Sequence, residues 1–248
     1  MRYNPKRHHL PPFAGGGIIS IDKPAGWTSF DVVNFLRNRY NIPKVGHCGT
    51  LDPAATGLLV LVLGEYTKYS DKLMAQDKVY ECKLQLGLET DSYDLEGTVV
   101  AEKEVNVTVE ELIAALHSFE GDQMQMPPMV SAIKMGGKKL YELARKGVEV
   151  EREARPITIS SITVGKIELP FCDFVLECSK GTYVRSLCHD IGAKLGCGGT
   201  LAALRRLRSG SFDIKDAVTI DQLKELDVEG FKTLLAQKFS IFAGFGGR

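Results

Sequence analysis

The sequence lacks a long hydrophobic run. In 248 residues, no apolar stretch approaches the roughly 20 residues that a membrane-spanning helix needs. The first residues, MRYNPKRHHLPPFAGGG, carry basic side chains with no apolar stretch before Ile18. That is not the pattern of a signal peptide. We therefore expect a cytoplasmic protein with a flexible basic arm over residues 1–16.

The sequence also lacks the spacings of common metal and nucleotide sites. Its six cysteines form no C-x-x-C pair, and neither His47–Cys48 nor Cys188–His189 has a second half at zinc spacing. Reduced, mostly buried thiols and no bound metal are expected. A Walker or Rossmann phosphate loop, a G-x-S-x-G elbow and an H-E-x-x-H helix are all missing. DSYDLEG, residues 91–97, does not match the ligand positions of an EF-hand.

The sequence has no net charge, with 31 basic and 31 acidic residues. A neutral total argues weakly against a nucleic-acid partner. The distribution is nevertheless uneven, because residues 89–122 are acidic, while residues 134–155 and the segment LRRLR, residues 204–208, are basic. Two interpretations stay open: ordinary solvated charge, which composition alone favours, and a basic face opposite an acidic one.

Hydrophobic spacing and capping residues predict a mixture of strands and helices without strict alternation, which is typical of an α+β fold with a largely antiparallel sheet. The six apolar residues 58–63 fit a buried strand, although a run this short also fits a helix. Further strands are expected at 18–21, 79–86, 157–164 and 174–178, and helices at 28–40, 108–119, 138–147, 181–196, 220–226 and 231–237.

A single aspartate, Asp52, lies in the glycine-rich stretch GHCGTLDPAATG, just before the apolar run. Gly46, Gly49 and Gly57 are expected to adopt positive φ or to approach other backbone closely. Pro53 restricts the backbone of the aspartate that precedes it. Such a loop can present one carboxylate rigidly at a pocket wall. The alternative is an ordinary Asp-Pro turn.

A second stretch, CSKGTYVRSLCHDIG, places a strand end, a glycine turn and a helix start in succession. It is expected to put Tyr183 and Arg185 in the first helical turn. An arginine at a helix N-terminus is unfavourable for the helix dipole, so it should have a carboxylate or phosphate partner. The alternative is a surface arginine without a partner.

Several blocks of the sequence together resemble the bacterial tRNA pseudouridine-55 synthases, the TruB-like group. The blocks occur in family order between Ile18 and Phe212 and include IDKPAGWTSFDVV, KVGHCGTLDPAATGLLVLVLGEYTK, KVYECKLQLGLETDSYDLEG, QMPPMVSAIKMGGKKLYELARKGVEVEREAR, CSKGTYVRSLCHDIGAKLGCGG and LRRLRSGSF.

The resemblance implies a role for each site residue. Asp52 matches the catalytic aspartate, Tyr80 the tyrosine that stacks on the target base, and Arg185 the arginine that pairs with the aspartate. His47, Tyr183 and Leu204 match residues that line the uridine pocket or contact the flipped nucleotide, and Lys23 and Pro24 match a supporting motif.

The resemblance further implies a mixed, mainly antiparallel sheet flanked by helices, with a thumb inserted at about residues 124–151. The catalytic domain would span residues 17–215, followed by a tail, residues 216–248, that is too short for the RNA-binding PUA domain of many relatives. The expected activity is isomerisation of uridine 55 in the T-arm of tRNA by a monomer, without cofactor or metal.

Three other interpretations remain. A tRNA-folding module would bind and remodel the T-arm without chemistry. A related synthase would act on ribosomal or guide-directed RNA. A hydrolase would use Asp52 and His47.

Overall fold

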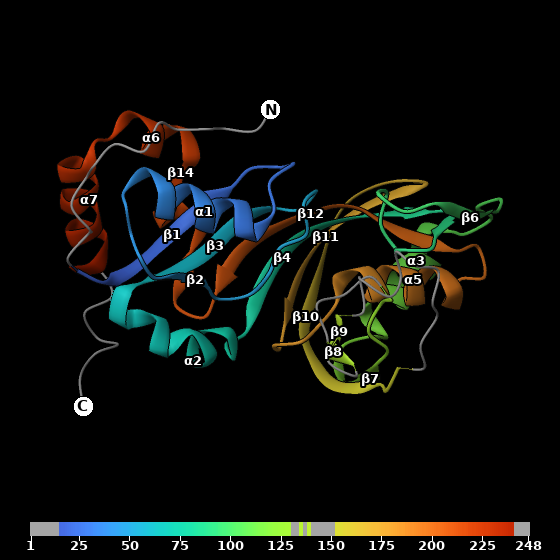
Figure 1. Ribbon diagram of the computed structural model, residues 1–248. Helices are drawn as coiled ribbons and strands as arrows, with labels where there is room; N and C mark the ends of the chain where they lie inside the picture. The colour runs from blue at the N-terminus through green and yellow to red at the C-terminus, as the bar shows by residue number, and fades with distance from the viewer. Residues whose placement is uncertain (1–14, 130–133, 136–137, 140–151, 241–248) are drawn as a thin grey trace. The chain divides into compact units, whose positions relative to one another are not determined.

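The computed structural model describes residues 15–129, 134–135, 138–139 and 152–240 (Figure 1). The chain forms two compact units, Met1–Lys78 with Arg205–Arg248, and Val79–Leu204. Both combine strands of a mixed, mainly antiparallel sheet with helices, so the predicted α+β class is confirmed.

The first unit is built on the antiparallel pair of β1 (Gly17–Lys23) and β3 (Thr56–Leu63). All residues of β3 after Thr56 are buried, because apolar clusters cover both faces of this pair. Leu59 belongs to one cluster and Leu58 to the other. A strand that is buried on both faces has a continuous apolar sequence. The strand interpretation of residues 58–63 is therefore confirmed.

Shorter strands and helices surround this pair. Thr28 caps the first helix through a capping box with Asp31. The strands are β2 (Val45–His47) antiparallel to β3, β12 (Gly199–Ser209) parallel to β3, β13 (Phe212–Asp213) antiparallel to β12, and β14 (Val218–Thr219) parallel to β1. The helices are α1 (Ser29–Arg39), η1 (Gly64–Tyr69), α2 (Ser70–Met74), α6 (Ile220–Glu225) and α7 (Val228–Ser240).

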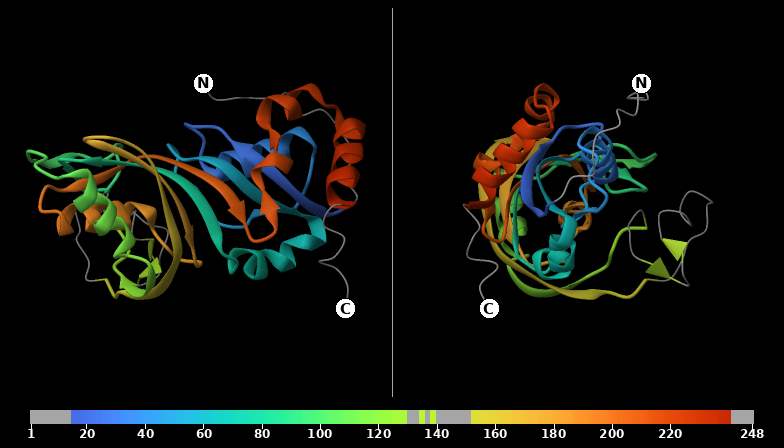
Figure 2. Two further views of the ribbon diagram at one scale, coloured as in Figure 1. Left: turned by 180° about the vertical axis from the view of Figure 1, so that it is seen from behind. Right: turned by 60° about the vertical axis from the view of Figure 1, so that its left-hand side comes forward.

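The last two helices, α6 and α7, drawn in red in Figure 2, are part of the core of the first unit. The Phe231 ring of α7 stacks on Tyr40, with ring centroids 4.0 Å apart and an interplanar angle of 12°. Arg39 Nη2 donates a hydrogen bond to the Leu226 carbonyl at 3.0 Å. Both predicted helices of the tail are confirmed, and they pack against α1 and β1.

The second unit is a sheet with strand order β12-β4-β11-β10-β7, carrying helices α3 and α5. Its strands alternate between buried and less buried positions, as the sequence predicts for strands with two unlike faces. The elements are β4 (Lys78–Leu86), β5 (Leu88–Thr90), β6 (Val99–Glu102), α3 (Val109–His117), β7 (Gly121–Gln125), β10 (Arg155–Glu168), β11 (Phe171–Cys178) and α5 (Val184–Lys194). A capping box of Thr108 and Glu111 begins α3, and α5 ends just before Gly196, which has a positive φ.

Some expectations differ from the structure or lie outside it. The sequence did not predict β12, because its arginines interrupt the apolar pattern expected of a strand. It also did not predict the short pair β5–β6, whose valines are exposed. Lys138–Lys139, at the start of the expected helix 138–147, instead form strand β9 against β8 (Lys134–Met135). The rest of that helix, the arm up to residue 14 and most of the thumb lie outside the described residues.

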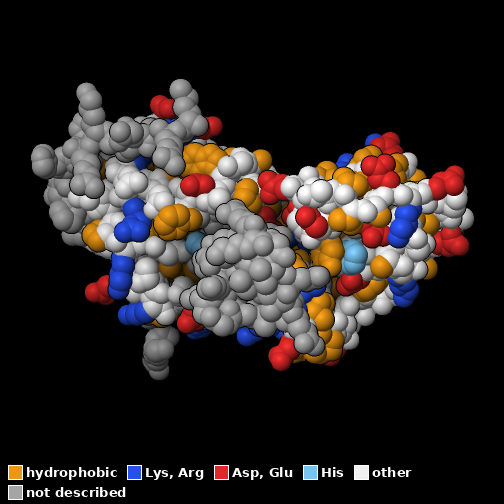
Figure 3. All heavy atoms as spheres, turned by 45° about the vertical axis from the view of Figure 1, so that its right-hand side comes forward, with side chains coloured by type: hydrophobic (Ala, Val, Ile, Leu, Met, Phe, Trp, Pro, Cys, Tyr) orange, Lys and Arg blue, Asp and Glu red, His pale blue; other side chains and the backbone are white. Residues whose placement is uncertain are grey.

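Most acidic side chains of residues 89–122 are exposed on the second unit. Figure 3 shows acidic side chains (red) gathered toward the right of one face. The basic segment 134–155 is described only in part, so the basic face stays a prediction. The exposed acidic residues of the segment are Asp91, Glu96, Glu102, Glu104, Glu110, Glu111, Glu120 and Asp122.

All six cysteines are free and buried, which confirms the predicted state of the thiols. None of the helices in the described ranges has both the length and the hydropathy that crossing a membrane requires.

Replacing Phe231 by alanine should lower the free energy of unfolding by about 3–5 kcal/mol, because a fully buried ring and its stack are lost. Urea unfolding at an unchanged m-value measures this loss. The matched control, Phe30→Ala, removes a ring that is 59% exposed and should change the free energy by no more than about 0.5 kcal/mol. Equal effects of the two changes would mean that α7 does not stabilise the core.

Candidate active site

Asp52 lies in a loop whose main chain is tied down on both sides of the carboxylate. Before it, Ser29 Oγ in α1 donates to the Leu51 carbonyl at 3.1 Å and accepts from the Leu51 N–H at 2.9 Å. After it, the Pro53 carbonyl accepts a hydrogen bond from the Gly26 N–H at 2.9 Å. The loop therefore holds the half-buried Asp52 at a fixed place beside the sheet.

Lys23, at the end of β1, supports the same loop from inside the protein. Its side chain is fully buried, and Nζ donates to the carbonyls of Pro24 at 2.9 Å, Trp27 at 2.6 Å and Pro53 at 3.2 Å. A buried ammonium is costly unless its donors are satisfied, and here three carbonyls accept from it. The cation thereby joins the turn after β1 to the residue that follows Asp52.

Arg206, in β12, is a second buried cation beside this loop, and the sequence did not point to it. Its Nε donates to the Leu58 carbonyl at 2.7 Å and its Nη2 to the Gly49 carbonyl at 3.1 Å, so one side chain ties both ends of the loop. The main chain of β12 also lies close to the main chain of the loop at Gly57. A Cβ at Gly57, whose φ is 98°, would lie 2.4 Å from the Arg206 carbonyl oxygen. Only glycine fits there.

The expectation for the loop glycines is confirmed at Gly49, with a φ of 104°, and at Gly57. It is wrong for Gly46, whose φ is not positive. A Cβ on Gly46, which lies inside β2, would meet side-chain methyl groups of Val62, at 3.4 Å, and Thr67, at 4.0 Å, and no backbone atom within 4 Å.

The segment LRRLR is not one solvated basic face, because its side chains have different surroundings along β12. Arg205 forms two hydrogen bonds with the Asp22 carboxylate, at 3.1 Å and 2.7 Å. Arg206 is buried, Arg208 is exposed, and Leu204 is half-buried.

His47 and Cys48 lie where β2 leads into the loop. His47 is half-buried, while Cys48 is 1% exposed. Burial raises the pKa of the Cys48 thiol to about 11, so it stays protonated at neutral pH. A protonated thiol is a poor nucleophile, so Cys48 is not suited to attack a substrate from this loop.

The remaining site residues expected from the sequence belong to the second unit. Tyr80 lies in β4 and is 8% exposed. Arg185 is the second residue of α5, as expected. The placement of Tyr183 in the first turn is wrong: it is the N-cap, with extended backbone (φ −101°, ψ 108°), and the helix begins at Val184.

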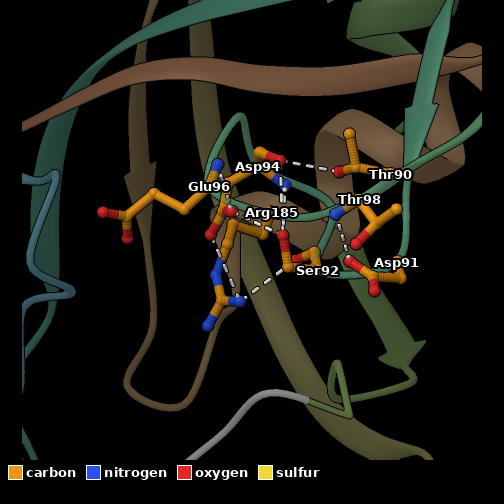
Figure 4. A network of polar contacts seen from close by, with 7 residues as sticks. All are labelled: Thr90, Asp91, Ser92, Asp94, Glu96, Thr98 and Arg185. Carbon is orange, nitrogen blue, oxygen red and sulfur yellow. Dashed lines mark hydrogen bonds and ion pairs between the residues drawn. The ribbon is translucent and has the colours of Figure 1, made fainter. Parts of the chain in front are cut away.

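Arg185 is buried and has an anionic partner, as the dipole argument required. Its Nη1 donates to the Ser92 carbonyl at 3.0 Å and lies 3.5 Å from Asp94 Oδ2 (Figure 4). The carboxylate partner was not identified from the sequence, because DSYDLEG was considered only as a calcium loop. Asp52 lies in the other unit, and its pairing with Arg185 stays a prediction.

The turn that holds Arg185 is stabilised by its own side chains (Figure 4). Asp94 Oδ1 accepts from Ser92 Oγ at 2.5 Å and from the Glu96 N–H at 3.1 Å, and Thr90 Oγ1 donates to the Asp94 carbonyl at 2.7 Å. Gly97 allows this compact form, because a Cβ there would lie 2.2 Å from Ser92 Oγ. These hydrogen bonds fix the Asp94 carboxylate independently of its contact with the Arg185 guanidinium.

The two units therefore contain different parts of the expected site. Lys23, His47 and Asp52 are in the first unit, and Tyr80, Tyr183, Arg185 and Leu204 are in the second. Among the described residues, no group of three or more His, Cys, Asp or Glu side chains could hold a metal ion.

The carboxylate of Asp52 in one unit and the buried guanidinium of Arg185 on helix α5 in the other are candidate groups of a chain that belongs to the pseudouridine synthase class. The family model described as "TruB family pseudouridylate synthase (N terminal domain)" matches residues 37–184, and "tRNA pseudouridylate synthase B C-terminal domain" matches residues 185–236. The chain is 49% identical over 216 residues to "tRNA pseudouridine synthase B" of Clostridium tetani, covering 87% of this chain and 75% of that relative. The chain belongs to the TruB family and is an isomerase that forms pseudouridine.

Solved structures agree with this fold. A Cbf5-Nop10-Gar1 complex contains a chain with a TM-score of 0.69 and 30% identity, over 90% of this chain and 59% of that chain. An H/ACA RNP bound to a substrate RNA containing 2'-deoxyuridine contains one with a TM-score of 0.63 and 29% identity, over 84% of this chain and 52% of that chain. This chain spans less than two thirds of the length of either.

Replacing Arg206 by lysine should lower the free energy of unfolding by about 1–3 kcal/mol, because one ammonium does not reproduce the fork that binds two carbonyls. The looser loop should slow pseudouridine formation by about tenfold. Urea unfolding and a single-turnover assay measure the two effects. Arg208→Lys, on the exposed part of the same strand, is the control and should behave as the unmodified protein.

Replacing Asp94 by asparagine should slow pseudouridine formation by about tenfold or more, because Arg185 loses the charge that holds its guanidinium. The single-turnover rate constant is the measurement. Glu96→Gln is the control, since the Glu96 side chain is exposed and points away from Arg185 in Figure 4. Equal rates for both variants would contradict a role for the Asp94 charge.

Proposed function

We propose that this chain isomerises uridine to pseudouridine in the T-arm of tRNA, at position 55, with Asp52 as the catalytic group. The observation that carries the proposal is the match of both family models across residues 37–236, which include the fixed loop of Asp52. The clostridial relative is named for the same reaction on tRNA.

In this reaction the N-glycosidic bond of uridine breaks, the base rotates, and a C–C bond forms between C5 and C1′. Atoms and electrons are only rearranged, so the proposal includes neither a cofactor nor a metal. Attack of a carboxylate on C1′, attack on C6 of the base, and removal of the 2′ proton all require an ionised, well-placed acid. The loop supplies the placement of Asp52.

Arg185 is proposed as the charge partner of Asp52. A positive charge beside a carboxylate favours the ionised form in a site from which water is excluded. Asp94 and the Ser92 carbonyl hold Nη1 of Arg185, which supports a guanidinium whose position is set before RNA binds.

The target base must leave its stack before the carboxylate can reach it, at a cost of a few kcal/mol. Tyr80 is proposed to stack on the extruded base, which contributes roughly 1–3 kcal/mol. Its place in the hydrogen-bonded strand β4 supports a rigid stacking surface. His47, Tyr183 and Leu204 are proposed to contact the flipped nucleotide.

Replacing Asp52 by asparagine should abolish turnover, while the affinity for RNA stays within about tenfold, because stacking and phosphate contacts remain. The test incubates the protein with a uridine-containing T-arm stem-loop without additives. With the unmodified protein, the expected result is a product of unchanged mass that reacts with carbodiimide as pseudouridine does. Asp71→Asn, at an exposed position of the same unit, is the control.

Other results would contradict this function. Turnover in the Asp52→Asn variant would remove Asp52 from the catalytic role. Release of free base or of cut strands by the unmodified protein would indicate a hydrolase. A tight complex with no chemical change would indicate a tRNA-binding module.

A further inference from the structure

Gln125, the last residue of β7, binds the main chain of Tyr183 at two points. Its Oε1 accepts from the Tyr183 N–H at 2.7 Å, and its Nε2 donates to the Tyr183 carbonyl at 3.0 Å. The Gln125 side chain reaches across 58 residues of sequence, and the residue is only 4% exposed. Inside the protein, one primary amide thus pairs with both polar groups of a single backbone residue.

The N-terminus of α5 needs hydrogen-bond partners from outside the helix. Tyr183 is the N-cap, has extended backbone, and makes no capping hydrogen bond with its own side chain. Helix N-termini leave main-chain groups that need partners from elsewhere. A second contact follows one turn on, where Ser186 Oγ donates to the Met126 carbonyl at 2.8 Å. Gln125 and the next residue, Met126, therefore bind the N-cap and the first turn of the helix.

The strand end that carries Gln125 is itself fixed. Gln125 pairs with Arg155 in the antiparallel ladder between β7 and β10. Two residues after Tyr183, Arg185 is bound by Ser92 and Asp94 in the turn after β5. The residues at the beginning of α5 are thus held by β7 at one point and by this turn at another.

We propose that Gln125 is a positioning residue for catalysis, which sets the main chain at Tyr183 and thereby the place of the Tyr183 ring and the Arg185 guanidinium. This inference rests on the proposed roles of Tyr183 and Arg185 in the reaction. A primary amide suits the task, because one of its N–H donors lies beside its carbonyl acceptor. A glutamate carboxylate lacks the donor, and methionine of similar length offers neither strong partner.

Gln125→Met tests the contact with little change in shape. We expect the single-turnover rate constant to fall by about tenfold to a hundredfold, since a small displacement of reacting groups costs rates of this size. The Kd for the stem-loop should stay within about threefold, because phosphate contacts dominate affinity for nucleic acid. Hydrogen exchange at the Tyr183 N–H should become faster, a readout that needs no activity.

Gln125→Glu separates positioning from general destabilisation through its pH profile. Burial raises the pKa of a carboxyl group, and the protonated acid has the same adjacent donor and acceptor as the amide. The rate of this variant relative to the unmodified protein should therefore rise by about fivefold or more between about pH 8 and about pH 5.5. A role that is only structural predicts that this ratio changes no more than the folded fraction of the variant does, which urea unfolding at the two pH values measures.

Two controls complete the experiment. Gln123→Met changes the same residue type on the same strand, where the side chain instead binds the nearby Phe119 carbonyl. Ile157→Val trims a buried side chain of β10, whose ladder partner is Gln123 and not Gln125, and lowers stability. Both should keep the rate within about twofold, as expected for residues outside the reacting groups.

The outcomes distinguish this inference from the function on which it rests. Faster exchange at Tyr183 with an unchanged rate in Gln125→Met, or a rate ratio in Gln125→Glu that changes no more than the folded fraction, overturns the positioning role. Unchanged exchange overturns the contact itself. An unmodified protein that forms no pseudouridine overturns the proposed function, whatever the exchange measurements give.

Discussion

Buried cations that bind main-chain carbonyls hold the functional loops of this protein in place. Lys23 is fully buried and reaches the carbonyl of Pro53, next to Asp52. Arg206 is 1% exposed and binds the carbonyls of Gly49 and Leu58. Arg185 follows the same principle in the second unit, where it binds the Ser92 carbonyl. Burial makes these interactions strong, because an unpaired charge there would be very costly.

This constraint gives irregular backbone the rigidity that catalysis needs. Asp52 lies in a loop, and loops generally move more than strands and helices. Here the hydroxyl of Ser29 holds Leu51, while two cations and a close approach at Gly57 fix the rest. The hydrogen bonds of Lys23 and Arg206 to loop carbonyls offset the free-energy cost of burying their charges, and a more mobile loop would lose these bonds.

Local sequence patterns predicted the long helices and, apart from β12, the long strands, because their signals are short in range. The capping box of Thr108 and Glu111, the apolar run 58–63 and the alternation in β4 each depend on neighbouring residues alone. Strand β12 was not predicted, because its arginines bind groups on β1 and in the loop of Asp52, and the sequence does not show these pairings. Asp94 was not identified as the partner of Arg185 for a similar reason, since the two residues lie 91 positions apart in the sequence.

The sequence alone determined the α+β class, the resemblance to one family of RNA-modifying enzymes, and the need of Arg185 for an anion, because capping, periodicity and helix dipoles act within a few residues. The tertiary structure decided which carboxylate meets Arg185 within its own unit, that Arg206 is a buried support and not a surface charge, and that Gln125 holds the start of α5. These features join segments far apart in the chain, and burial and hydrogen-bond geometry arise only once the chain has folded.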